Sequence, residues 1–241
     1  MPEIFGSNID NHIIVGPTAD TFANIRNDDG TGSDVTLGTA SDTKNSFCIS
    51  VYKFMGRGAD QFRIHRTFLY FDTSGITGTV SSATLKLNFV GSLIGNHSCI
   101  AIKSDAFGGD GSTALAGSDF NNLDFNTPYS SEITGTSTSA YTDITLNSDA
   151  RSDMQNNDSL IMAIINHDHD YSNSEPPPSA AINQRGLVFA DFSSTTRDPK
   201  IDYTEVSTAT FAKVNALAAG SISKVNALAI ANVGKINTIT D

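Results

Sequence analysis

Residues 61–71 read QFRIHRTFLYF, and the end of this stretch decides the fold. From Phe68 to Phe71, successive residues are large and apolar. Successive side chains of a β-strand point to opposite faces of the sheet, so a run of this kind needs cover on both faces. The stretch therefore predicts a central strand that is buried between two layers of the protein.

The segments around this stretch also have the patterns of strands. Residues 83–89 read ATLKLNF, which alternates so that Leu85, Leu87 and Phe89 face inward. Residues 160–165 read LIMAII, a continuous apolar run that is too short for a free-standing helix and suits a central strand. Further strands are expected at residues 13–15, 21–25, 46–54, 100–102, 142–146, 186–192 and 200–204, with a short helix over 148–155.

Strand count and composition together predict the fold class. Hydrophobic residues make up 39% of the 241 residues, which is enough for a core, while charged residues reach only 17%. Roughly eight to ten short strands separated by turn residues, without a long amphipathic helix, are typical of a sandwich or jelly roll. We therefore expect an all-β jelly-roll β-sandwich over residues 1–207, followed by a short repeat segment over 208–241.

The C-terminal segment repeats every 11 residues, with Lys213, Lys224 and Lys235 in one column. A right-handed coiled coil has this period, but a strand-turn-strand unit is favoured because the asparagine of each unit tolerates the left-handed region. Three small units cannot bury their apolar columns alone, so we expect oligomerisation or attachment through them. The apolar residues are Phe211, Val214, Leu217, Ile222, Val225, Leu228, Val233, Ile236 and Ile239.

Charge and apolar patterning exclude several classes of partner. The formal net charge of −11 repels phosphate backbones, and without a basic cluster the chain is not expected to bind nucleic acid. Residues 1–6 lack the pattern of a secretory signal, and no run approaches the roughly 20 apolar residues of a membrane span. Cys48 and Cys99 lie in apolar segments that indicate buried thiols, with a disulfide as the alternative.

The sequence has no recognised catalytic motif, which predicts a protein that is not an enzyme and has no catalytic residues. Its best metal candidate is the stretch 167–170, HDHD. Alternation would put Asp168 and Asp170 on one side, where their carboxylates and loop carbonyls suit a structural Ca²⁺. The two histidines suit a transition metal instead, and a solvated polar loop is the third interpretation. No other cofactor is expected.

Two stretches resemble a known family. Residues 66–76 (RTFLYFDTSGI) and 80–87 (VSSATLKL) are similar to the R-x-x-L-x-F-D-L-S-x-I and I-x-S-A-x-L-x-L core of DNRLRE-type domains. These are carbohydrate-binding-module-like jelly rolls of secreted bacterial proteins, so the resemblance implies that fold over about residues 13–205 and a surface glycan as a candidate ligand. The tail resembles the K-V-N-G-V-A repeats of tailed-phage virion proteins.

These observations favour a non-enzymatic virion structural protein of a tailed phage, a capsid decoration or a fibre-like subunit at the virion surface. It would display the jelly roll and assemble through its tail as a homo-oligomer, with a trimer favoured, on a larger structure such as a capsid. The alternative is an extracellular or surface-bound carbohydrate-binding module used for adhesion and stabilised by calcium. A polysaccharide-degrading enzyme is the third hypothesis.

Overall fold

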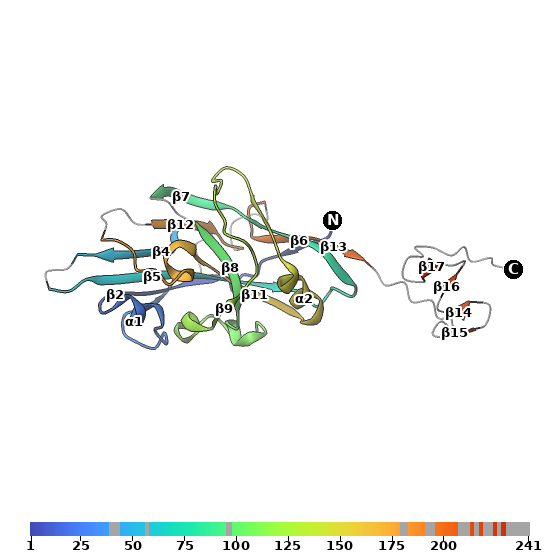
Figure 1. Cartoon of the computed structure of the whole chain (residues 1–241), viewed down its shortest axis with the longest axis horizontal. Helices are drawn as coiled ribbons and strands as arrows, with labels where there is room; N and C mark the ends of the chain where they lie inside the picture. The colour runs from blue at the N-terminus through green and yellow to red at the C-terminus, as the bar shows by residue number, and fades with distance from the viewer. Residues whose placement is uncertain are drawn as a thin grey trace.

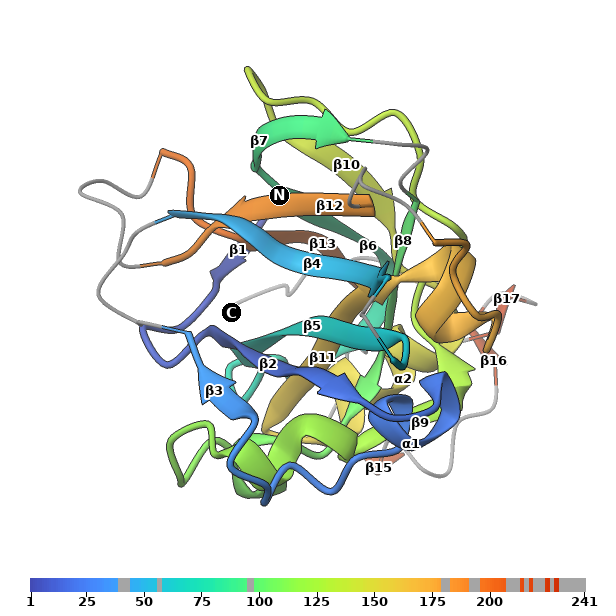
Figure 2. The ribbon, with the colours of Figure 1, turned by 90° about the vertical axis from the view of Figure 1, so that its left-hand side faces the viewer.

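A computed structural model describes residues 1–38, 44–55, 58–94, 98–178, 183–190 and 196–206, and four dipeptides of the tail. Strands predominate in the body and form two antiparallel sheets (Figure 1 and Figure 2). This arrangement confirms the predicted all-β sandwich. The smaller sheet has the order β1 (Glu3–Phe5), β13 (Lys200–Val206), β6 (Thr79–Leu87) and β10 (Thr142–Thr145).

The larger sheet contains nine strands, and short helical segments border it. Its main path is β7 (Phe89–Ile94), β12 (Asn183–Val188), β4 (Lys44–Phe54), β5 (Gln61–Asp72), β11 (Ser159–Asn166), β8 (Cys99–Ser104) and β9 (Leu123–Pro128). Strands β2 (Asn11–Ala19) and β3 (Val35–Leu37) complete it. The helical segments are α1 (Phe22–Arg26), η1 (Phe107–Gly109), η2 (Gly117–Asn121), α2 (Ser148–Asn156) and the π-helix η3 (His167–Tyr171).

Strand β5 is the centre of the larger sheet. It pairs with β2 over Gln61–Phe68, with β4 over Gln61–His65 and with β11 over Thr67–Asp72. A strand has only two edges, and the part of β5 that pairs with β2 overlaps the parts that pair with β4 and with β11. β2 therefore lies along one edge of β5, and β4 and β11 lie one after the other along the other edge. The sheet therefore divides next to Arg66, and this residue lies where the two parts separate.

Both faces of β5 are covered, as its sequence predicts. Leu69 and Phe71 belong to the hydrophobic cluster between the two sheets, which also contains Leu85 and Leu87 of β6. Phe68 belongs to a second cluster on the opposite face, where helix α1 and the segments η1 and η2 pack. Strand β11 alternates between the same two clusters, so the prediction of a second central strand is also confirmed.

The strand predicted over residues 21–25 is wrong. Strand β2 continues through the cis peptide Gly16–Pro17 to Ala19, and helix α1 follows it. The hydroxyl of Thr21 accepts a hydrogen bond from the backbone N–H of Asn24 (3.2 Å), which caps the helix at its start. The helix predicted over residues 148–155 is confirmed as α2. None of the helices in the described part of the chain is long and apolar enough to span a lipid bilayer.

Two repeats of the tail form short antiparallel strand pairs. Strand β14 (Lys213–Val214) pairs with β15 (Leu217–Ala218), and β16 (Lys224–Val225) pairs with β17 (Leu228–Ala229) in the equivalent register. For these two units the β-type prediction is confirmed and the coiled coil is wrong. The other apolar repeat residues lie outside the described residues, namely Phe211, Ile222, Val233, Ile236 and Ile239.

The cysteines are buried free thiols, which was the favoured of the two predicted states. The backbone N–H of Leu187 donates to Sγ of Cys48 at 3.2 Å. Burial raises the pKa of the Cys48 thiol to about 12, and burial raises the pKa of Cys99 as well. Neither thiol is therefore a reactive nucleophile in the folded protein at neutral pH.

Candidate functional site

The structure separates the two aspartates that alternation had placed on one side. Asp170 is fully buried (0% exposed), and its carboxylate accepts two hydrogen bonds from Arg66, from Nε to Oδ2 (2.8 Å) and from Nη2 to Oδ1 (2.7 Å). The Nε atom of Arg26 lies 3.5 Å from Oδ1 of Asp170 and donates to the Asp170 carbonyl at 2.6 Å. The guanidinium groups of two arginines therefore bind the Asp170 carboxylate, and the role of this side chain is structural.

The reason for the separation is the local backbone conformation. Residues 167–171 form the π-helix η3 and not an extended strand. The side chain of Asn166 accepts from the N–H of His169 (2.8 Å), and the N–H of Ser172 donates to the His167 carbonyl (3.1 Å), which closes the wide turn. Since side chains rotate around a helix axis, residues two positions apart point in different directions. The predicted alternation of Asp168 and Asp170 is therefore wrong.

Arg66 connects Asp170 to two other segments. Its Nη1 donates to the carbonyl of Phe120 (2.7 Å) and its Nη2 to the carbonyl of Arg26 (2.8 Å), while its guanidinium lies 4.1 Å from the centre of the Phe120 ring. A buried network of this kind costs desolvation and is stable only when its members are satisfied. The network fixes α1, η2 and η3 to the point at which the larger sheet divides.

Asp168 lies at the surface beside His167 and Glu132, two side chains of types that can bind metals. Nδ1 of His167 is 3.7 Å from Oε1 of Glu132 and 3.9 Å from Oδ1 of Asp168. One potential ligand atom from each of the three residues lies within 4.8 Å of the other two. Among the described residues, two of the candidate ligands from the stretch 167–170, His167 and Asp168, come together in such a group, and their role as metal ligands remains a prediction. Sequence reasoning missed Glu132, because only a long-range pairing brings it there.

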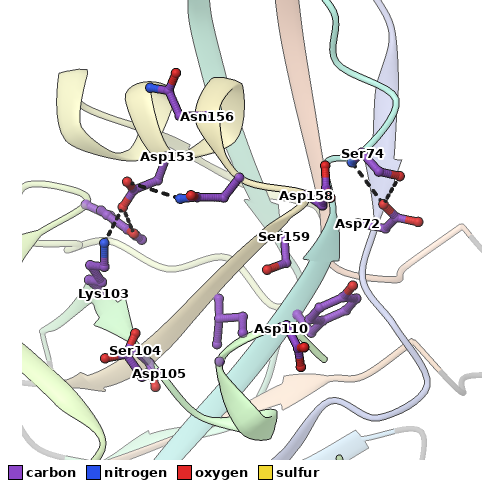
Figure 3. A pocket seen from close by; sticks show the side chains of 15 residues that line it. Asp72, Ser74, Lys103, Ser104, Asp105, Asp110, Asp153, Asn156, Asp158 and Ser159 are labelled. Atoms are coloured by element: carbon purple, nitrogen blue, oxygen red, sulfur yellow. Dashed lines mark hydrogen bonds and ion pairs between the residues drawn. The ribbon is translucent and has the colours of Figure 1, made fainter. Parts of the chain in front are cut away.

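The second candidate is an open cleft of about 720 Å³ where the ends of β5 and β11 meet β8 and α2 (Figure 3). The antiparallel register places Ser159 opposite Asp72, which brings Asp158 to the same end of the sheet. Lys103 also lines the cleft, so carboxylates exceed ammonium groups there and the potential is negative. The five acidic residues that line it are Asp72, Asp105, Asp110, Asp153 and Asp158.

Hydrogen bonds set the charges in this cleft. Nζ of Lys103 donates to Oδ2 of Asp153 (2.9 Å), and this bond raises the pKa of the lysine (Figure 3). The phenol of Tyr129 donates to the same oxygen, and its pKa is raised by burial and by this hydrogen bond. The pKa of Asp72 is lowered because its carboxylate accepts hydrogen bonds from the hydroxyl and N–H of Ser74. Lys103 and Asp72 are therefore both charged at neutral pH.

Tyr70 presents an aromatic ring to this acidic environment. Burial raises the pKa of its phenol, and the nearby charges of Asp72, Asp110 and Asp158 raise it further. The neutral phenol thus shares the cleft with several carboxylates, an arrangement that suits a polyhydroxylated or cationic ligand. Sequence reasoning missed the cleft because Tyr70 lies in a strand with the pattern of pure core, and its acidic neighbours come from distant segments.

Comparison with protein-family models and with curated proteins finds no match for this chain. The all-β sandwich alone does not identify a family, since proteins with many unrelated functions share this architecture. Membership of the DNRLRE-type domains therefore stays a prediction from residues 66–87. The acidic cleft and the group of Glu132, His167 and Asp168 are the two sites on which functional hypotheses rest.

Proposed function

We propose that the protein is a non-enzymatic structural subunit of a larger assembly, such as the surface of a phage virion. The sandwich is the displayed part, and the tail makes the contacts that hold copies together or attach them to a capsid. A homotrimer is the favoured state. The proposal rests on one observation, the identical strand pairing of two successive repeats in the tail.

The strand pairs support assembly for a physical reason. Each pair contains two residues per strand, and an isolated two-stranded sheet is marginally stable in water even when it is longer. The register places Val214 directly opposite Leu217, and Val225 directly opposite Leu228. Apolar residues therefore recur at the same place of each unit, which requires a neighbouring surface that covers them.

The structural roles of the buried polar groups support a protein without catalytic activity. Arg66 and Asp170 satisfy each other in the interior. His12 is 1% exposed and stacks on His65 with ring centres 6.1 Å apart, and burial lowers the pKa of His12 to about 4. These groups hold secondary structure elements together, which is the role expected in a display scaffold.

The mass of the full chain in solution tests assembly directly. Light scattering after size-exclusion chromatography is expected to give an oligomer for the natural protein. The triple variant Val214→Asp, Val225→Asp and Ile236→Asp is expected to be monomeric, because charge replaces one apolar column. The matched variant with Lys213, Lys224 and Lys235 changed to Gln should keep the oligomer. A natural protein that is monomeric at all concentrations contradicts the proposal.

The acidic cleft favours a second candidate function, a carbohydrate-binding module used for adhesion. Its carboxylates and serines can hydrogen-bond sugar hydroxyls beside the ring of Tyr70. A glycan array should then give specific hits that Tyr70→Ala removes and Asp158→Asn weakens. Tyr141→Ala is the control, because the phenol of Tyr141 binds the carbonyl of Asp198 and the residue does not line the cleft. An array without hits, or hits that both tyrosine variants remove, argues against this function.

A further inference from the structure

We infer that Glu132, His167 and Asp168 form a binding site for a divalent transition metal, with Zn²⁺ as the ion that fits its ligands. The site is independent of the tail and of the acidic cleft, so it goes beyond both proposed functions. It also replaces the calcium site expected from Asp168 and Asp170, because Asp170 is bound by arginines and an imidazole takes its place.

The backbone holds the three residues together from both sides of Ser98. Cys99 forms an isolated bridge with Ile133, in which the N–H of Cys99 donates to Ile133 (3.1 Å) and the N–H of Ile133 donates back (2.7 Å). On its other side Cys99 pairs with Asn166 of β11, and the N–H of His167 donates to the Ser98 carbonyl at 3.0 Å. Glu132 and His167 therefore flank the same strand end through short backbone hydrogen bonds.

His167 is the residue that distinguishes this group from a chance cluster of acids. Its Nδ1 atom is buried and makes no hydrogen bond within the described part of the chain. The ring stacks on Tyr171, with centres 5.5 Å apart and planes inclined by 22°, so its orientation is fixed. A buried nitrogen without a hydrogen-bond partner is costly, and two carboxylate oxygens, one from Glu132 and one from Asp168, lie near this one. A metal ion between these atoms would satisfy all three.

Hydrogen bonds from Ser98 orient the carboxylate of Asp168. The hydroxyl of Ser98 donates to its Oδ1 at 2.8 Å, and the N–H of Ser98 lies 3.2 Å from its Oδ2. Carboxylates that ligate metals are commonly oriented by such outer hydrogen bonds. Glu132 is 44% exposed and free to adjust, so the group combines two oriented ligands with one that closes on the ion.

The ligand types and distances fit zinc better than calcium. Ligand distances of about 2.0–2.2 Å place two tetrahedral zinc ligands about 3.4 Å apart. The separations of 3.7 Å and 3.9 Å around Nδ1 need only a small contraction to reach this value. Calcium takes six to eight oxygen ligands, and an imidazole nitrogen is not among them. Three protein ligands are the usual number for an open zinc site, and they leave the fourth position to water.

Calorimetric titration of the chelator-treated full chain with ZnCl₂ at neutral pH tests the site. We expect one Zn²⁺ per chain, at least a tenfold loss of affinity in His167→Gln and in Glu132→Gln, and a rise in Tm with zinc that these variants lack. His169→Gln is the matched control on the same helix, because His169 lies by the Ser174 carbonyl (3.0 Å) and outside the group. Co²⁺ should give the visible absorption of a four-coordinate ion in the natural protein and in the control.

Two results would overturn the inference. Equal zinc binding by the natural protein and His167→Gln would show that the ion binds elsewhere. A lack of zinc binding in a folded natural protein would show that the three side chains do not form a metal site. Because the measurement does not involve the tail, a negative result leaves the oligomer mass as a separate test of assembly.

Discussion

The interior and surface sides of the π-helix η3 use two aspartates of one tetrapeptide in opposite ways. Asp170 is buried and binds two arginines, whereas the side chain of Asp168 is 36% exposed, accepts a hydrogen bond from Ser98 and lies near His167 and Glu132. On the interior side the chain itself supplies the positive charge. On the surface side carboxylates outnumber cationic groups. The surroundings of an acidic residue therefore depend on the side of η3 that it occupies and not on the motif in which it stands.

The largest effect is expected on the interior side. Asp170→Asn leaves Arg66 and Arg26 buried without a counter-charge, and breaking a buried ion pair in this way costs about 3–5 kcal/mol. Urea unfolding followed by circular dichroism measures this loss. Asp168→Asn is the matched variant on the surface side and should cost less than about 1 kcal/mol. Equal losses for the two variants would remove the distinction between the sides.

The second largest effect is expected at the buried histidine His12, which makes the stability of the protein depend on pH. The pKa of His12 is lowered by burial from 6.5 to about 4, so between these values the unfolded chain binds a proton that the folded chain does not. His12 therefore weakens the fold as pH falls from about 6.5 towards 4, by about 3 kcal/mol at most. Unfolding free energies of His12→Gln should fall less steeply over this range. Equal slopes for the natural protein and His12→Gln would show that this histidine does not cause the pH dependence.

A smaller effect on stability is expected at Ser98, which orients the surface carboxylate of Asp168. Ser98→Ala removes the hydroxyl that donates to Asp168, which should lower the free energy of unfolding by about 1 kcal/mol. If the metal site exists, the same change should weaken zinc binding about tenfold, because outer hydrogen bonds orient the ligand. Loss of stability with unchanged zinc affinity would show that Asp168 does not ligate the ion.

The smallest effect is expected for an ion pair whose carboxylates lie at the surface. Nζ of Lys53 lies 2.7 Å from Oε1 of Glu175 and 2.6 Å from Oδ2 of Asp60, and Glu175 is 53% exposed. Glu175→Gln should change the free energy of unfolding by less than about 0.5 kcal/mol, because water screens such pairs and Asp60 remains. A loss comparable to that of Asp170→Asn would mean that burial does not determine the contribution of an ion pair in this protein.

The sequence was sufficient for the central strands and insufficient for the sites. The apolar runs of β5 and β11 predict burial on both faces, because the period of a strand is a local property. Helix α1 was missed because its five residues offer little periodicity, although the cap at Thr21 was a usable signal. Glu132 and the acidic cleft depend on pairings between segments far apart in the chain, such as Ser159 with Asp72, which no local pattern reveals.

The burial of both cysteines gives the protein an internal reporter of its own opening. Cys48 and Cys99 are 0% exposed, and both lie in the cluster between the two sheets. A thiol reagent added to the folded protein can modify them only when the sheets come apart. The rate of modification therefore measures how often the sandwich opens under native conditions, with no mutation and no denaturant. If the protein assembles as proposed, a comparison of this rate in the assembled and the isolated protein would report whether neighbouring copies slow that opening.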